Sequence, residues 1–227
     1  MGADRERIGV VVVAYNAEST LLKTLDRIPE SFRSRIDEII IADDSSLDDT
    51  FEIGKQWARR HDSVKTHVLR HTKNLGYGGN QKAAYSLAIE HDLDIVVLLH
   101  GDGQYAPECL PEIVEPFEHT ECAAVFGSRM MYKGAARRGG MPLYKRLGNR
   151  ILTRFENTVL GSSLTEFHSG YRAYRTDVLK RIPFTANSDG FDFDTQIIAQ
   201  VLHVGGQIVE VPIPTYYGDE ICYVNGM

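Results

Sequence analysis

Asp102 and Gln104 are two side chains whose types and spacing suit chemistry on a phosphorylated ligand. They lie in the segment Gly101-Asp102-Gly103-Gln104, directly after the apolar run Ile95–Leu99. A carboxylate and an amide oxygen are hard ligands, which Mg²⁺ or Mn²⁺ can use while keeping positions open for phosphate oxygens. The alternative for this segment is a turn in which Asp102 accepts a hydrogen bond from its own backbone.

Two further segments have side chains or backbone groups that could contact a nucleotide. Asp43 and Asp44 follow the apolar run Ile39–Ala42, and their carboxylates could accept hydrogen bonds from a base or a ribose. The glycine-rich segment 76–80 enters a helix and could bind phosphate through free backbone N–H groups. Both have structural alternatives, because acids such as Asp44 and Glu18 also favour helix N-termini and glycines also suit a turn with a helix cap.

Strands that alternate with helices must position these segments. Residues 8–14, 39–42, 64–69, 95–99 and 123–126 predict strands, and continuously apolar runs such as 8–14 predict burial on both faces. Helices are predicted over 21–28, 46–60, 78–91 and 107–118, the second opened by a capping box of Ser46 and Asp49. This order predicts an α/β fold with a mostly parallel central sheet and helices on both faces. Ligands bind beyond the carboxyl ends of strands in such sheets, which is where Asp44 and Asp102 fall.

The second half of the sequence is less regular. We expect a helix with a basic face over 143–160, a short extended segment over 169–174, a helix over 194–203 and a strand over 207–211. No linker interrupts the sequence. We therefore expect a single domain over residues 1–227, with a nucleotide-binding half at about 8–128 and an acceptor-side half at about 129–227.

Composition and charge restrict the function. A net charge of −6 at pH 7 argues against nucleic acid as a partner. Three widely separated cysteines and a charged N-terminus without a signal-peptide pattern favour a cytoplasmic location. The apolar runs are far shorter than the ~20 residues of a membrane-spanning helix, so any membrane contact is expected to be peripheral, at the inner face. Basic residues concentrated between Lys133 and Arg154 form either a solvated helix face or a landing site for an anionic substrate or lipid.

The motifs also occur in the order that is typical of a known enzyme family. The segments Val13-Ala14-Tyr15-Asn16, Ala42-Asp43-Asp44-Ser45-Ser46, Asn74-Leu75-Gly76-Tyr77-Gly78-Gly79 and Gly101-Asp102-Gly103-Gln104 together resemble family-2 glycosyltransferases of the GT-A fold. Gly127-Ser128-Arg129 and Ser169-Gly170-Tyr171-Arg172 resemble the branch of dolichol-phosphate mannosyltransferases and bacterial polyprenyl-phosphate glycosyltransferases. The resemblance covers about residues 8–215. It implies an inverting transfer of a sugar from a nucleotide-diphosphate sugar to a polyprenyl phosphate, or to a hydroxyl of another cell-envelope or glycan acceptor.

The resemblance further implies roles for individual residues. The nucleotide sugar would contact Ala14, Tyr15, Asn16, Glu18, Asp44, Gly78, Gly101 and Asp102. Asp102 and Gln104 would hold Mg²⁺ or Mn²⁺, with His100 as a further ligand because it replaces the first Asp of the family's DxD motif. The phosphates or the acceptor would face Arg129, Arg146, Ser169 and Arg172.

The acceptor decides whether catalysis needs a base in addition to Asp102. A hydroxyl acceptor needs a carboxylate within hydrogen-bond reach, and Glu166, Asp192 and Asp194 are the candidates. Asp194 could instead cap the helix that follows it. A polyprenyl phosphate is already an anion and needs no base. One departure concerns Ala17, where the mannosyltransferase branch usually has Glu directly after Asn.

Three other functions share part of this pattern. A dinucleotide-dependent oxidoreductase would need GxGxxG after the first strand, where this chain has Ala14-Tyr15-Asn16. A sugar nucleotidyltransferase typically carries a glycine-rich loop with Arg and Lys after the first strand, and this chain lacks such a loop. A non-catalytic nucleotide-sugar binding module stays open because the DxD motif is incomplete. The sequence indicates neither the nucleotide and sugar nor whether copies form a homo-oligomer.

Overall fold

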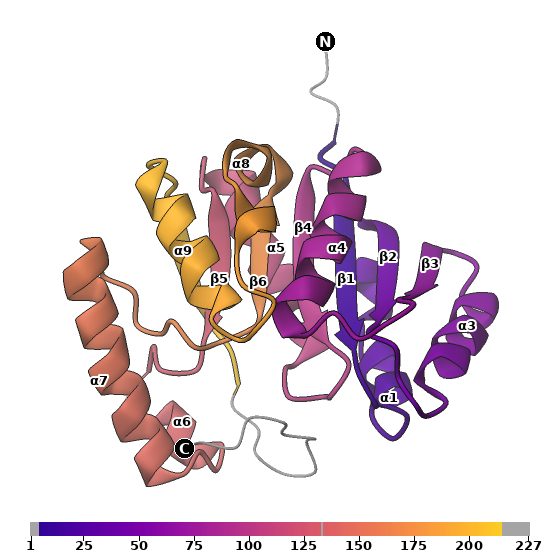
Figure 1. Ribbon diagram of the computed structural model, residues 1–227, viewed down its shortest axis with the longest axis horizontal. Helices are drawn as coiled ribbons and strands as arrows, with labels where there is room; N and C mark the ends of the chain where they lie inside the picture. The colour runs from indigo at the N-terminus through magenta and orange to yellow at the C-terminus, as the bar shows by residue number, and fades with distance from the viewer. Residues whose placement is uncertain (1–4, 133, 215–227) are drawn as a thin grey trace.

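Residues 5–132 and 134–214 are described by the computed structural model, and a seven-stranded sheet runs through them (Figure 1). The strands are β1 (Ile8–Ala14), β2 (Ile36–Asp43), β3 (Lys65–Arg70), β4 (Ile95–His100), β5 (Ala124–Ser128), β6 (Arg172–Arg175) and β7 (Ile208–Pro212). Their order across the sheet is β3-β2-β1-β4-β6-β5-β7. Because β1 is parallel to both β2 and β4, the loops that follow these strands leave the same edge of the sheet, at the bottom of Figure 1.

The direction of the strands confirms the mostly parallel sheet. All the pairs among β1, β2, β3 and β4 are parallel, and so is the pair of β5 and β7. Strand β6 is antiparallel to both its neighbours, β4 and β5. The sequence predicted only a short extended segment there, because a strand of four residues carries no signal for its direction. All seven residues of β1 are buried, as its apolar run predicts.

Helices cover both faces of the sheet. The helices α1 (Leu21–Asp26), α2 (Glu30–Arg33), α3 (Thr50–Arg60) and α5 (Leu110–His119) contribute to one hydrophobic core. The helices α4 (Tyr77–Glu90), α8 (Thr176–Arg181) and α9 (Phe193–His203) contribute to the core on the other face. The remaining described elements are α6 (Ala135–Arg138), α7 (Leu143–Leu160) and 3₁₀ turns at Pro107–Cys109 and Phe184–Ala186.

The start of α3 corrects one prediction. This helix begins at Thr50 with Asp49 at the N-cap position, and no side chain caps it. Ser46 donates its hydroxyl to the carboxylate of Asp43 instead. The predicted capping box is therefore wrong, because Ser46 lies in the loop between β2 and α3 and not at the helix end.

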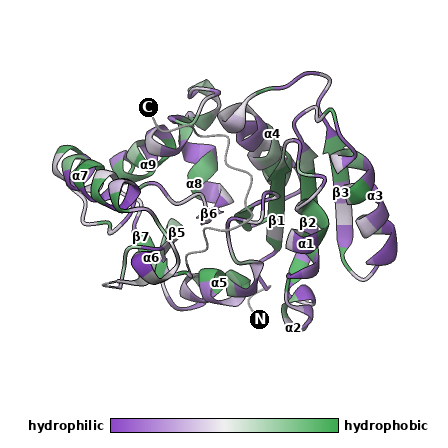
Figure 2. Ribbon diagram, turned by 90° about the horizontal axis from the view of Figure 1, so that it is seen from below, coloured by the Kyte–Doolittle hydropathy of each residue, from purple (hydrophilic) through white to green (hydrophobic). Residues whose placement is uncertain are grey.

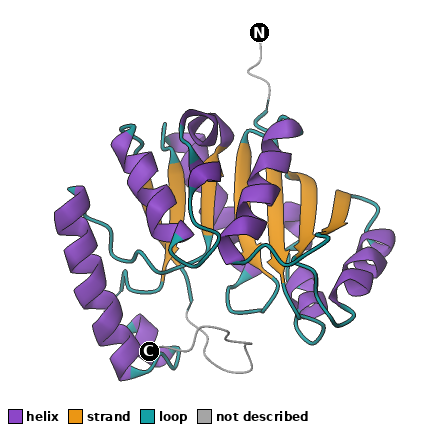
Figure 3. Ribbon diagram, in the orientation of Figure 1, coloured by secondary structure: helices purple, strands orange, loops and turns teal. Residues whose placement is uncertain are grey.

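Helix α7 has the predicted bounds and arginines on its exposed surface, as the predicted basic face requires, but most of its large apolar residues are exposed as well. Its buried residues, Asn149 and Thr153, are polar. The side facing away from the protein carries large apolar residues, among them Leu147 (57% exposed), Ile151 (61%) and Phe155 (66%). The helix stands at one edge of the molecule, beyond α9 in Figure 1, and a loop joins its end to β6 (Figure 3). In Figure 2, green hydrophobic segments alternate with hydrophilic ones along its length.

Candidate active site

The loops after β1 and β2 are joined at the carboxyl edge of the sheet. Asn16, whose φ is 47°, donates its backbone N–H to the hydroxyl of Ser46 over 2.9 Å. Its side-chain oxygen accepts the N–H of Leu47, also over 2.9 Å. The N–H of Glu18 reaches Asp48 Oδ2 at 3.1 Å. These contacts hold the predicted nucleotide-binding segment in one conformation at the point where the strand order changes direction, between β1 and β4.

Gly101 lets the loop after β4 pass close to this segment. Its N–H donates to Val13 O over 2.9 Å, and a Cβ at Gly101 would lie 3.1 Å from the Cβ of Ala14. Tyr15, by contrast, is 37% exposed. The structure therefore places Ala14, Tyr15, Asn16 and Gly101 at one edge, as predicted from the strand ends. Their contact with a nucleotide sugar stays a prediction.

Asp44 ties this edge to the glycine-rich segment. Its Oδ1 accepts the N–H of Leu75 over 2.7 Å, and its Oδ2 accepts the N–H of Gly76 over 3.0 Å. Asp44 is almost fully buried, and burial raises its pKa in spite of these two hydrogen bonds. Asp44 thus fixes the entry to α4 besides any contact with a nucleoside.

Gly78 has a packing role in the structure. Its N–H donates to Asp189 O over 2.7 Å, and a Cβ at this position would lie 2.5 Å from Ser188 O. The N–H groups of Leu75, Gly76 and Gly78 all have acceptors within the protein, so the segment does not present them to a ligand. The prediction that free N–H groups at these positions bind phosphate is therefore wrong. The glycines instead allow α4 to pack closely against the loop before α9.

Asp102 forms the turn that the sequence left as an alternative. Its Oδ1 accepts the N–H of Gln104 over 2.9 Å, and Gly103 between them has a φ of 78°. Asp102 and Gln104 are both half-buried, in a loop at the tip of β4. Each carboxylate oxygen has two lone pairs, so bracing the turn and holding a cation are compatible. The set of oxygen donors fits Mg²⁺ or Mn²⁺.

His100 lies among aromatic rings. Its ring centroid is 5.5 Å from that of Tyr77 and 5.2 Å from that of Tyr105, and its Nε2 is 3.4 Å from Tyr77 Oη. A Cβ on Gly170 would come within 2.7 Å of the imidazole. Burial lowers the pKa of His100 to about 4, so the ring is neutral at physiological pH. The neutral form is the one that can bind a metal.

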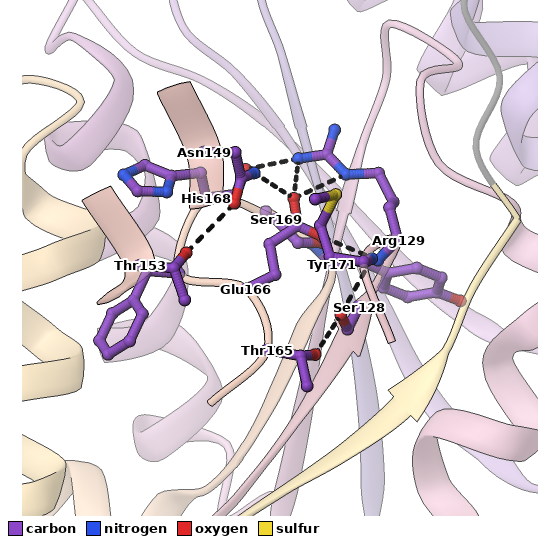
Figure 4. Close-up of polar contacts among 12 residues, drawn as sticks. Ser128, Arg129, Asn149, Thr153, Thr165, Glu166, His168, Ser169 and Tyr171 are labelled. Atoms are coloured by element: carbon purple, nitrogen blue, oxygen red, sulfur yellow. Dashed lines mark hydrogen bonds and ion pairs between the residues drawn. The ribbon is translucent and has the colours of Figure 1, made fainter. Parts of the chain in front are cut away.

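Arg129 and Glu166 form a buried ion pair beside the site (Figure 4). Glu166 Oε2 accepts the backbone N–H of Arg129 over 2.7 Å, and Oε1 accepts from the guanidinium Nε over 3.0 Å. Oε1 also accepts from the Asn149 amide over 2.9 Å, and Asn149 Oδ1 accepts from the Thr153 hydroxyl. The polar side of α7 is therefore attached to the end of β5 through Glu166. With both oxygens engaged, Glu166 is placed to orient Arg129.

Ser128 and Ser169 are two further polar residues close to this ion pair (Figure 4). Ser128 Oγ is 2.6 Å from Thr165 Oγ1, and Thr165 hydrogen-bonds to Glu210 in β7. Ser169 is buried, and its carbonyl accepts from Arg172 Nε over 2.7 Å. Contact of Ser169 with an acceptor stays a prediction.

Arg172 is held from several sides. It is 1% exposed, its Nη2 donates to Phe167 O over 2.7 Å, and its Nη1 lies 3.1 Å from Asp194 Oδ1. Asp194 Oδ2 also accepts the hydroxyl of Tyr77 over 2.9 Å. In this position Arg172 fixes Asp194 and the loop before β6, and its predicted contact with a phosphate stays untested.

The remaining candidate bases occupy the start of α9. Asp192 is exposed at the N-cap position, and its Oδ2 accepts from the side chain of Gln196 over 3.0 Å. Asp194 lies in the first turn of the helix and not at its cap. Asp194 compensates the charge of Arg172, and the role of either residue as a base stays a prediction.

Arg146 lines a pocket where α7 starts. The pocket has a volume of about 90 Å³ and is lined by Met130, Tyr132, Gly134, Ala136, Arg137, Leu143, Arg146, Leu147 and Arg150. Arg146 Nε is buried and has no hydrogen-bond partner within the described chain. Three guanidinium groups thus adjoin apolar side chains. Of the predicted basic stretch, Lys133 lies outside the described residues, as does the side chain of Arg138.

Sequence reasoning missed Tyr77, Tyr105 and Asn149 as parts of the site. Tyr77 contacts a residue 117 positions away, and Tyr105 accepts the N–H of Gly170, 65 positions away. Asn149 in α7 donates to Glu166, which lies 17 positions later in the loop after this helix. Contacts between residues so far apart cannot be predicted from the spacing of motifs. The presence of Tyr77 in the glycine-rich motif was the one available signal.

Comparison with known proteins adds a family to this geometry. The sequence model described as "Glycosyl transferase family 2" matches residues 9–183. An undecaprenyl-phosphate mannosyltransferase of Micrococcus luteus is 31% identical over 214 residues, which cover 91% of this chain and 82% of that protein. A UDP-N-acetylglucosamine–dolichyl-phosphate N-acetylglucosaminyltransferase of Methanococcus voltae is 27% identical over 92% of this chain and 86% of its own length.

A solved structure shares the fold. Glucosyl-3-phosphoglycerate synthase from Mycobacterium tuberculosis, crystallised with Mn²⁺ and UDP-glucose, superposes with a TM-score of 0.67. The match covers 94% of this chain and 72% of that chain at 20% identity, so it shows the fold alone. Among the described residues, no helix has both the length and the hydrophobicity to cross a membrane.

Proposed function

This chain belongs to glycosyl transferase family 2, and we propose that it moves a sugar from a nucleotide-diphosphate sugar to a polyprenyl phosphate. The names of two relatives support the acceptor, because one uses undecaprenyl phosphate and the other dolichyl phosphate. The observation that carries the proposal is the pocket in which Arg137, Arg146 and Arg150 adjoin apolar side chains. A lipid phosphate needs both kinds of contact.

The donor would bind at the edge formed by the loops after β1, β2 and β4. Tyr15, Asn16, Glu18 and Asp44 would contact its nucleoside. Asp102 and Gln104, and His100 as a neutral ligand, would hold Mg²⁺ or Mn²⁺. Such an ion supplies Lewis acidity that neutralises the charge developing on a departing diphosphate.

The acceptor would approach from the side of α7. Arginine binds phosphate through several N–H donors in a planar fork, and the buried Nε of Arg146 has a donor to spare. Arg129 would add positive charge close to the reacting groups, held in place by Glu166. A phosphate monoester is already ionised and attacks without a general base. This agrees with a structure in which Glu166 and Asp194 are both engaged by arginines.

Helix α7 would lie on the surface of the membrane that contains the acceptor. Its outward face is apolar, while exposed Arg150 and Arg154 lie on a stripe next to that face. Amphipathic helices of this kind bury the apolar face at the boundary between headgroups and acyl chains, and basic residues pair with anionic lipids. The contact would be peripheral and at the cytoplasmic face.

A transfer assay tests the reaction. A panel of labelled UDP-, GDP-, dTDP- and CDP-sugars is offered with a short-chain polyprenyl phosphate and Mg²⁺ or Mn²⁺. We expect the parent protein to form a polyprenyl-phosphate sugar from one of these donors. Asp102→Asn should lower the rate at least about 100-fold. Arg146→Gln should raise the KM for the lipid. Both variants should unfold at the parent's temperature. Binding of a nucleotide sugar without turnover on any lipid phosphate would refute the proposal.

Vesicle flotation tests the membrane contact separately. The parent protein should float with vesicles containing anionic lipid and less with neutral ones, and Ile151→Glu or Phe155→Glu should abolish flotation. Val204→Glu, at an exposed apolar position after α9, is the matched control. If the two α7 variants instead convert a dimer to a monomer and leave flotation unchanged, the face binds a second copy and not a membrane.

A further inference from the structure

Glu38, His67 and His91 form a cluster at the end of the sheet opposite the candidate active site. Glu38 precedes Asp43 by five residues in β2, a distance of about 16 Å along the strand. His67 lies in the edge strand β3, and His91 directly follows α4. The side chain of Glu38 is 2% exposed, but those of His67 and His91 are 36% and 24% exposed. The two imidazole rings are therefore partly exposed, while the carboxylate between them is buried.

The positions of the three potential ligand atoms are close to those of a metal site. All three lie within 4.8 Å of one another. Glu38 Oε2 is 3.3 Å from His67 Nε2 and 2.6 Å from His91 Nδ1. Two ligand atoms each about 2.05 Å from a tetrahedral Zn²⁺ are about 3.3 Å apart. The first separation already has this length, and the second needs a shift of about 0.7 Å in the partly exposed ring of His91.

The chemical state of the cluster also suits a metal. His67 Nε2 is buried and has no aligned hydrogen-bond partner in the described part of the chain, although it faces Glu38. Burial lowers the pKa of His67, which keeps the lone pair of its ring available. Burial alone would raise the pKa of Glu38, but hydrogen bonds from Lys65 and His91 outweigh it, and the net pKa is lowered.

We propose that Glu38, His67 and His91 form a binding site for Zn²⁺ or a similar transition-metal ion. Two imidazoles and one carboxylate with water in a fourth position are a common ligand set for Zn²⁺, whereas Mg²⁺ prefers oxygen ligands alone. The bound ion would link β2, β3 and the end of α4. It would stabilise the edge strand and take no part in sugar transfer.

Two neighbouring cationic side chains affect how strongly this site should bind a metal ion, and this effect can be tested. Lys65 Nζ lies 2.6 Å from Glu38 Oε1, and Arg7 Nη2 lies 3.6 Å from the same oxygen. They engage Oε1 and leave Oε2 to the histidines. Their positive charge opposes a dication, so removing the charge of Lys65 should strengthen metal binding.

Calorimetric titration of the untagged full chain with ZnCl₂, in saturating Mg²⁺, tests the site. We expect one Zn²⁺ per chain, a loss of affinity of at least about tenfold in His67→Gln and His91→Gln, and a gain in Lys65→Gln. Asp102→Asn should bind Zn²⁺ like the parent. A hundredfold excess of Zn²⁺ over its Kd should raise the unfolding temperature by about 5 °C or more.

Several results would overturn the assignment. They are a parent protein that binds no Zn²⁺, histidine variants that titrate like the parent, or loss of the ion in Asp102→Asn. Because Lys65→Gln predicts tighter binding, it tests the site even if a histidine variant fails to fold. Weaker binding in Lys65→Gln would also count against it.

Discussion

Replacing Glu166 by Gln distinguishes a residue that orients Arg129 from a catalytic base. Glu166 accepts the backbone N–H and the guanidinium of Arg129 and the amide of Asn149. The change keeps the shape of the side chain but removes the charge that compensates Arg129, which is only 6% exposed. Arg129 would then be a buried cation with neutral partners.

The expected loss of stability is large. Removing one partner of a buried ion pair costs about 3–5 kcal/mol, because the remaining charge stays desolvated. At this chain length, each kcal/mol lowers the unfolding temperature by about 2–4 °C, so we expect a fall of about 10 °C. The double variant Arg129→Gln with Glu166→Gln should lose at least about 2 kcal/mol less than the sum of the single variants, because the two neutral amides can bond to each other.

Urea denaturation monitored by fluorescence measures these values, since the sequence has one tryptophan, Trp57, and it is buried. Sugar transfer is assayed on the same samples. If Glu166→Gln is as stable as the parent but inactive, Glu166 acts as a base and the positioning role is refuted. Additive losses in the double variant would show that the two side chains do not form a coupled pair.

Four further substitutions test contacts of the glycine-rich segment and of α7. Gly78→Ala should destabilise the protein by about 1–3 kcal/mol because its Cβ meets a backbone oxygen. In thermal unfolding, Gly148→Ala in α7, where the space is open, should instead stabilise by about 0.5–1 kcal/mol; equal shifts would contradict the packing argument. Tyr77→Phe removes the hydroxyl that donates to Asp194 and should cost about 1–2 kcal/mol in the same measurement; no change would argue against that bond. Asp44→Asn loses one acceptor for the N–H groups at 75 and 76, so hydrogen exchange there should accelerate about tenfold, and unaltered protection would show that Asp44 does not hold the loop.

The sequence predicted those parts of the fold that depend on local pattern. The strands of the first half were found because buried parallel strands are continuously apolar, as in Ile8–Ala14. The position of Asp102 followed from the same pattern, since a strand end marks the loop. The direction of β6 did not follow, because four residues between two neighbours carry no record of their partners.

The chemical setting of the site residues depends on contacts that cross the chain. Arg129 and Glu166 are 37 positions apart, and nothing in either motif indicates that they pair. The same holds for Asp44, whose carboxylate bonds to backbone groups beyond the next strand. Residue type predicted that these side chains matter. Only the fold shows which of them are already engaged by the protein.

The exposed apolar face and buried polar residues of α7 have a consequence for how variation in this chain is interpreted. A library scored on folding alone would tolerate lysine or glutamate at Leu147 or Phe155, which are exposed, and reject leucine at Asn149 or Thr153, which are buried and hydrogen-bonded. Scores that treat a hydrophobic-to-charged change as damaging would rank these positions in the wrong order. In this helix we expect the substitutions that look most severe to leave the fold intact, and those that look harmless to destabilise it.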